Sequence, residues 1–69
     1  MNSYLITKAI KQAMKEYPGL ESLDDPYPRI AEFLPSGGYE KLFPAKPNES
    51  SFQWSERVEN EVSAIWSNI

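Results

Sequence analysis

Apolar residues recur with the period of an α-helix near the N-terminus. At 100° per residue, the apolar side chains between residues 3 and 17 occupy about half of a helical wheel. These side chains are Leu5, Ile6, Ala9, Ile10, Ala13, Met14 and Tyr17. Ser3 has the residue type of an N-cap, and Pro18 with Gly19 is typical of a helix end. The pattern therefore predicts an amphipathic helix over residues 3–17.

The C-terminal segment carries a narrower apolar stripe, within about 120° of the wheel. Its members are Trp54, Val58, Val62, Ile65, Trp66 and Ile69, with Phe52 just outside it. Ser50 and Gln53 have the spacing of a capping box, in which a hydroxyl and an amide bond the first free N–H groups. A strand over residues 51–58 is the competing interpretation, but Glu56 breaks its alternation and no second strand is available to pair with it. We therefore predict a helix over residues 51–68.

Prolines divide the middle of the chain into short segments. Asp25 before Pro26 is typical of an N-cap followed by proline in the first turn, where a missing N–H costs nothing. Apolar residues follow until Pro35, which cannot continue a helix. This punctuation predicts a short helix over residues 26–34.

A sharp turn and a second short helix are expected next. The serine and two glycines at positions 36–38 favour a turn, because glycine adopts positive φ without strain. Residues 38–43 are predicted to form a short helix, and residues 44–49 to form an extended linker. Leu20 and Leu23, three residues apart, are expected to form one turn that packs on the core. The predicted fold is an all-α, small single-domain helical bundle over residues 1–69.

The size of the chain limits what it can bury. A core within 69 residues rarely contributes more than about 3–5 kcal/mol of net stability. The chain has no cysteine and no histidine, so neither a disulfide nor a thiolate or imidazole metal site can reinforce it. We therefore expect no metal and no cofactor. Stability must come from helix packing or from self-association.

The charge is small in sum but uneven along the chain. The net charge is −3. The first 19 residues carry three lysines and one glutamate, for 3 − 1 = +2, whereas residues 48–69 carry four glutamates and one arginine, for 1 − 4 = −3. No apolar run approaches the roughly 20 residues that cross a bilayer. Lysines interrupt the apolar positions near the N-terminus, which does not resemble a signal peptide, so we expect a cytoplasmic protein without membrane association.

Catalysis is disfavoured by the residue types that are missing. Histidine and cysteine are the commonest general base and the best thiol nucleophile, and the sequence contains neither. Its adjacent carboxylates, Asp24 and Asp25, are explained by helix capping, and Glu56, Glu59 and Glu61 by a solvated helix face. We therefore predict that the protein is not an enzyme.

The surplus of aromatic residues favours binding to another protein. The chain has nine aromatic side chains, more than a core of this size can enclose, and exposed aromatics are frequent at interface hot spots. The predicted contact residues are Tyr27, Tyr39, Phe43 and Trp54, with Trp66 and Ile69 as an alternative patch. The leading hypothesis is a non-catalytic protein–protein interaction protein, such as an adaptor, regulator or inhibitor, whose partner is another protein or a second copy of itself.

Binding to nucleic acid is the alternative hypothesis. Lys8, Lys11 and Lys15 form a stripe on the first predicted helix, next to Tyr4, and could contact a phosphate backbone. The net negative charge and the absence of arginine from this stripe disfavour that function. Pairing of these lysines with the acidic C-terminal helix, within one chain or between two, is the other expectation for them.

Overall fold

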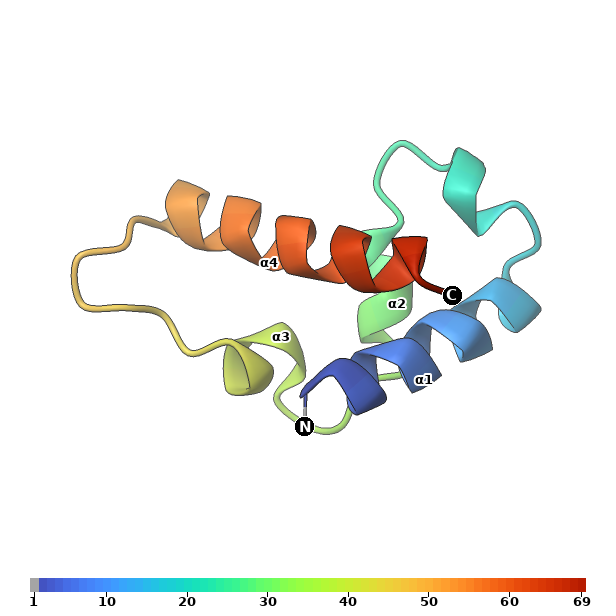
Figure 1. Ribbon diagram of the computed structural model, residues 1–69, viewed down its shortest axis with the longest axis horizontal. Coiled ribbons are helices and arrows are strands. Elements are labelled where there is room, and N and C mark those ends of the chain that lie inside the picture. Colours follow the sequence, from blue (N-terminus) through green and yellow to red (C-terminus); the bar gives the residue numbers. More distant parts are fainter. Residues whose placement is uncertain (1) are drawn as a thin grey trace.

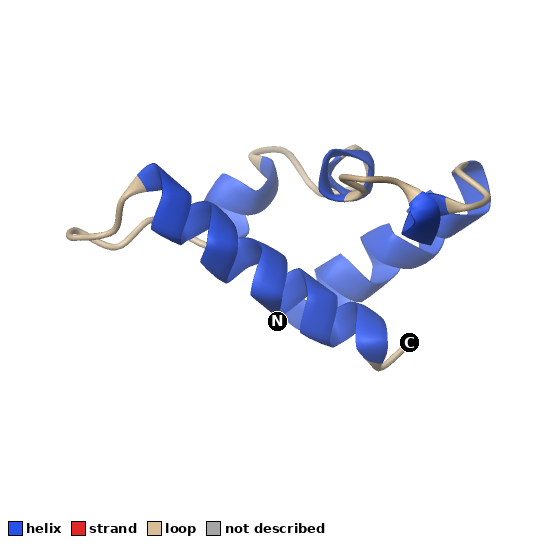
Figure 2. Cartoon of the chain, turned by 90° about the horizontal axis from the view of Figure 1, so that it is seen from above, coloured by secondary structure: helices blue, strands red, loops and turns tan. Residues whose placement is uncertain are grey.

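The computed structural model describes residues 2–69 and, in that part of the chain, contains helices and loops but no strand (Figures 1 and 2). The elements are α1 (Asn2–Glu16), the 3-10 turn η1 (Leu20–Ser22), α2 (Tyr27–Ala31), α3 (Gly38–Leu42) and α4 (Ser51–Ser67). The all-α prediction is confirmed, with two longer helices at the ends and two short ones between them.

The ends of the helices agree only in part with the predicted caps. The capping box is confirmed, because Ser50 Oγ accepts a bond from the Gln53 backbone N–H at 3.1 Å and Gln53 Oε1 accepts one from the Ser50 N–H at 2.9 Å. Ser3 is not an N-cap, because α1 already begins at Asn2. Asp25 is not one either: Pro26 occupies the N-cap position of α2 and no side chain bonds the first turn.

The middle helix is shorter than predicted. α2 ends at Ala31, and the chain continues through 3-10-type bonds from Phe33 N–H to Ile30 C=O and from Leu34 N–H to Ala31 C=O, both 3.1 Å long. The reason is Pro35, which disfavours helical geometry in the residue before it. The predicted turn follows, with positive φ at both glycines, and a Cβ added to Gly37 would lie 2.9 Å from the Cβ of Lys41.

The core forms where α1 contacts α2 and α4. Nine apolar side chains are buried there: Ile6, Ala9, Ile10, Ala13, Leu20, Ile30, Phe43, Val58 and Val62. Four of them come from α1, on the face that the periodicity predicts. The alanines at positions 9 and 13 keep that face flat, so the neighbouring helices can approach closely.

The two leucines of the η1 region have different environments. Leu20 is fully buried, but Leu23 is 43 % exposed. The expectation that both pack on the core is therefore correct for Leu20 and wrong for Leu23. The physical reason is that Leu23 follows the 3-10 turn in an extended conformation, with ψ of 147°, and leaves the core side of the turn.

A polar and aromatic cluster joins the end of α1 to α2. The Tyr17 hydroxyl donates to Glu32 at 2.6 Å, and its ring meets Phe33 edge to face, with centroids 6.5 Å apart. The Arg29 guanidinium lies 5.2 Å from the Tyr17 ring centroid and also bonds Glu32 at 3.2 Å. Through these contacts Arg29 helps to hold α2 against the end of α1.

The N-terminal half of α4 extends beyond α1. In Figures 1 and 2, α1 lies alongside the C-terminal half of α4, while α3 and the loop that follows it lie near the other half. Because α1 does not cover that half, its apolar side chains depend on α2 and α3 for contacts. The candidate site is found there.

The two leucines provide a matched test of this core. Leu20→Ala should reduce the free energy of unfolding by about 2–5 kcal/mol, because it leaves a cavity where no solvent reaches. Leu23→Ala should cost less than about 1 kcal/mol, because much of that side chain is already in water. Urea unfolding followed by circular dichroism measures both values. Equal losses would show that Leu23 packs as deeply as Leu20.

Candidate functional site

Two neighbouring pockets on the N-terminal half of α4 share Trp54 and Ser55 in their linings, and we call the two together the acidic groove. Their volumes are about 510 and 230 Å³. The aromatic side chains that line the groove are Tyr27, Tyr39 and Trp54, and the carboxylates are Asp25, Glu40, Glu49 and Glu59. Among the described residues, no lysine or arginine lines either pocket. The groove therefore combines aromatic surface with negative charge.

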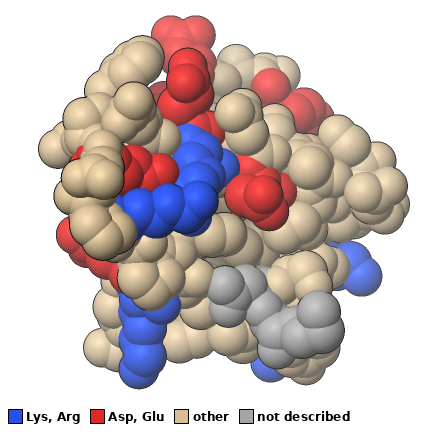
Figure 3. Space-filling view, turned by 60° about the vertical axis from the view of Figure 1, so that its left-hand side comes forward, with Lys and Arg blue, Asp and Glu red and all other residues tan. Residues whose placement is uncertain are grey.

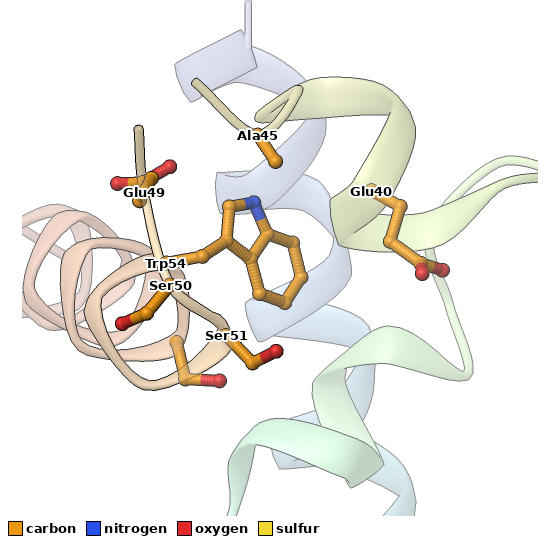
Figure 4. A pocket seen from close by; sticks show the side chains of 7 residues that line it. Glu40, Ala45, Glu49, Ser50, Ser51 and Trp54 are labelled. Atoms are coloured by element: carbon orange, nitrogen blue, oxygen red, sulfur yellow. The ribbon is translucent and has the colours of Figure 1, made fainter. Parts of the chain in front are cut away.

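Trp54 separates the two pockets. Its indole extends from α4 toward α3, where Glu40 stands on the far side of the larger pocket (Figure 4). The indole Nε1–H donates to the backbone carbonyl of Phe43 at 2.6 Å, which fixes the ring orientation. Because its polar atom is satisfied within the chain, Trp54 offers only its apolar ring surface to the groove.

The two tyrosines of the groove bond to the protein itself. The Tyr39 hydroxyl donates to the backbone carbonyl of Tyr27 at 2.8 Å, and the Tyr27 hydroxyl lies 3.4 Å from Ser63 Oγ. Burial raises the pKa of the Tyr39 phenol above its ordinary value, and the negative charges near it, including Asp25 and Glu59, raise this pKa further. The two carboxylates therefore place negative charge in the same pocket as the Tyr39 phenol.

The loop that closes one end of the groove is fixed by an ion pair. The Arg57 guanidinium donates to both carboxylate oxygens of Glu49, at 2.7 and 2.8 Å, and to the carbonyl of Pro44 at 3.1 Å. Glu49 also accepts the backbone N–H of Lys46 at 3.1 Å. As expected for a linker, residues 44–49 form neither helix nor strand, and the bidentate pair in addition anchors this segment to α4.

An exposed phenylalanine lies beside the groove. Phe52 is 73 % exposed, the largest exposure among the large apolar side chains that the structure describes. It precedes Ser55 by three residues and Glu59 by seven, so the three side chains follow one stripe along α4. Phe52 thus lies on the same side of α4 as two residues that line the groove, Ser55 and Glu59.

The structure places the predicted contact residues in different environments. Tyr27, Tyr39 and Trp54 come together in the groove. Phe43 does not join them at the surface: it is only 8 % exposed and belongs to the core, because the chain turns inward where α3 ends. That part of the sequence-based expectation is corrected.

The alternative patch is split between two further hollows. Trp66 is partly buried and lines a hollow beside Tyr27 and Leu23. Ile69 is 48 % exposed, follows the end of α4 and lines a different hollow with Thr7 and Lys11 of α1. The structure therefore does not unite Trp66 and Ile69 in one surface.

The lysine stripe lies on the exposed side of α1. Lys8, Lys11 and Lys15 are all exposed, and Tyr4 is 66 % exposed. The ion pairs found within residues 2–69 are Arg29–Glu32 and Arg57–Glu49, so these lysines pair with no carboxylate of the described chain. Pairing between α1 and α4 within one chain is thus not observed.

Phe52 and the groove carboxylates are the site residues that the sequence analysis missed. Phe52 fell just outside the apolar arc of its helix, and a large apolar residue at such a position is a signal for surface exposure. From the sequence, capping and a solvated helix face are sufficient to explain Asp25 and Glu59. Their approach to Tyr39 depends on how α2, α3 and α4 are arranged. No pattern among residues that are close in the sequence predicts that approach.

Searches for other kinds of site among the described residues add little. No group of three or more carboxylates in residues 2–69 comes together as a metal site would require. None of the helices described is both long enough and apolar enough to cross a bilayer. Comparison with protein families, curated proteins and solved structures finds no match for the chain.

The Glu49–Arg57 pair predicts an acid-sensitive stability. Hydrogen bonding from Arg57, with help from the Lys46 N–H and both positive charges, lowers the pKa of Glu49 from 4.5 to about 2. Since the folded pKa is the lower one, the pair stabilises the fold fully above about pH 4.5 and loses this effect as the pH falls toward 2. Glu49→Gln should therefore melt at a lower temperature than the wild type at pH 7, and the difference should shrink toward pH 2.

Thermal unfolding followed by circular dichroism at several pH values measures this difference. The matched control is Glu56→Gln on the exposed face of α4, which should barely change the melting temperature at pH 7. A difference between wild type and Glu49→Gln that stays constant from pH 7 to pH 2 would contradict the assignment.

Proposed function

We propose that this protein is a non-catalytic protein-binding module that docks a basic partner surface in the acidic groove and against Phe52. The observation that carries the proposal is the 73 % exposed Phe52 ring beside a groove lined by three aromatic side chains and four carboxylates. A cytoplasmic location, expected from the sequence, belongs to the same proposal.

Burial of Phe52 supplies the apolar part of the binding energy. Transferring a phenylalanine side chain from water to an apolar contact contributes about 1.5–3 kcal/mol. The neighbouring rings of Tyr27, Tyr39 and Trp54 are already held by hydrogen bonds, so a partner would order few additional side chains. A preformed aromatic surface of this kind is typical of interface hot spots.

The carboxylates select the charge of the partner. Asp25 and Glu59 stand on one side of Trp54, and Glu40 stands on the other. Of the four carboxylates, Glu49 is the one that Arg57 neutralises, so the other three are free of ion pairs within the described chain. A lysine- or arginine-bearing surface would gain favourable contacts here, whereas an acidic surface would be repelled.

The absence of histidine and cysteine from the whole sequence supports a binding role over a catalytic one. Contact with nucleic acid through the α1 lysines remains the second candidate, which their exposure and lack of ion pairs favour. The negative potential of the acidic groove opposes it, because that groove would repel a phosphate backbone.

Site-specific photocrosslinking tests the docking surface. A benzoylphenylalanine in place of Phe52, in protein added to an extract of the source cells, should form a covalent adduct with a protein partner. The same group in place of Asn60, on the exposed polar face of α4, is the matched control and should form none. Adducts that arise equally from both positions, or from neither, would refute docking at the groove.

Removal of the Phe52 ring tests how much this side chain contributes to binding affinity. Phe52→Ala should weaken binding of the captured partner about 10- to 100-fold, since each 1.4 kcal/mol corresponds to a factor of ten. Asn60→Ala, on the exposed polar face of the same helix, should leave the affinity within about twofold. Titration calorimetry with the captured partner measures both.

A further inference from the structure

We infer that the partner of the acidic groove is a second copy of this chain, which lays the Lys8, Lys11 and Lys15 face of its α1 into the groove. This inference rests on the proposed function, because it names the occupant of the same groove. It also gives a role to the lysine stripe, which makes no ion pair within the described residues of its own chain.

The chain carries both halves of a complementary contact. The groove presents Asp25, Glu40 and Glu59, and none of the three pairs with a basic side chain within residues 2–69. The α1 face presents three exposed lysines that are equally without ion pairs among the described residues. Opposite charges that are both left unpaired at a surface favour association between copies.

The two halves cannot meet inside one copy. α1 packs on α2 and α4 with its buried face, which turns its lysines outward. The groove lies on the N-terminal half of α4, which extends past α1 in both ribbon views (Figures 1 and 2). A second molecule is therefore needed to bring an α1 face to the groove.

The α1 face has a shape that suits a groove. Tyr4, Lys8, Lys11 and Lys15 follow one another at intervals of four, three and four residues, so they form a single stripe along the helix. From Lys8 to Lys15 this stripe rises about 10 Å, at about 1.5 Å per residue. One copy thus brings a straight basic rod to the groove of the next.

Apolar contact accompanies the charge on both sides. Tyr4, 66 % exposed, stands one turn before the first lysine, and Phe52, 73 % exposed, stands beside the groove. These are the two most exposed large apolar side chains among the described residues. Salt screens the attraction between the lysines and the carboxylates. Burial of Tyr4 and Phe52 against the other copy would add an apolar stabilisation to that attraction.

The available surface also permits such a contact. Figure 3, turned toward the side where the α3–α4 loop lies, shows acidic side chains around a few basic ones, with uncharged surface between them. A standard interface buries about 800 Å² of accessible surface on each partner. The total accessible surface of the chain is 4888 Å², so one such contact would cover only part of it. Because the α1 face and the groove are different patches, the contact runs from head to tail unless a two-fold axis lets two copies exchange both patches.

Charge reversal on either half tests the inference. In the first variant Lys8, Lys11 and Lys15 are all changed to Glu, and in the second Asp25→Lys is combined with Glu59→Lys. The weight-average mass should rise above 7.9 kDa for the wild type between about 10 µM and 1 mM at low salt. Each variant alone should stay at the monomer mass, because its groove and α1 face now repel. An equimolar mixture of the two should associate again, because each groove then meets an α1 face of opposite charge.

Light scattering after gel filtration measures these masses, and circular dichroism verifies that each variant is folded. If a reversed variant does not fold, the neutral set Lys8→Gln, Lys11→Gln and Lys15→Gln replaces it and should weaken association at least tenfold. A wild type that stays monomeric at 1 mM would overturn the inference. So would variants that associate like the wild type, or a mixture that does not recover.

The outcomes also separate this inference from the proposed function. A monomeric wild type whose residue-52 crosslinker captures a different protein would overturn the second copy as partner and leave the docking function intact. Absence of crosslinks from position 52 would overturn both. Duplex DNA of 20 base pairs that binds the lysine stripe at low salt, with a wild type that alone stays monomeric, would assign the lysines to nucleic acid and overturn self-association.

Discussion

Burial of one face of α1 is the interaction on which the rest of this structure depends. Four of the nine buried side chains belong to α1, and α2 and α4 both pack on that face. The chain has no disulfide to replace this contact, because it has no cysteine. The small residues Ala9 and Ala13 matter here as much as the larger ones, since they allow the partner helices to approach. Segments that do not contact α1 must be held in place by other interactions.

The N-terminal half of α4 shows what those other ways are. A hydrogen bond from Trp54 to Phe43, a bond from Tyr39 to Tyr27 and the Glu49–Arg57 pair hold α2, α3 and the loop around it. Such contacts fix positions without filling all the space, and the acidic groove is the result. The same arrangement that completes the fold therefore leaves an aromatic surface exposed, with carboxylates around it. A fold of this size would gain stability if a partner covered that surface.

Charge distribution connects the groove to the proposed role. The first 19 residues, which include α1, carry a net charge of +2, whereas residues 48–69 carry −3. In a single copy these charges mostly face water, because α1 uses its apolar side for packing and turns its lysines outward. Association would let them meet, which is why the proposals for the groove and for the lysine stripe complete each other.

The sequence by itself determined the helices, their polar and apolar faces and most of their ends. These features depend on residues close together in the chain: the 3.6-residue period of α1 and α4, the capping box at Ser50 and the glycine turn at Gly37 and Gly38. The failures at this level, Ser3 and Asp25 as caps and the extension of the middle helix to residue 34, concern only where a helix begins or ends.

Only the tertiary structure decided which aromatic side chains lie at the surface. Phe43 and Phe52 are both apolar and both near helix ends, yet one is in the core and the other in water. The meeting of Tyr27, Tyr39 and Trp54, and the anchoring of the loop by Arg57, likewise join residues that are 8 to 27 positions apart. Such contacts depend on how the helices pack in space, and no periodic pattern in the sequence predicts that packing.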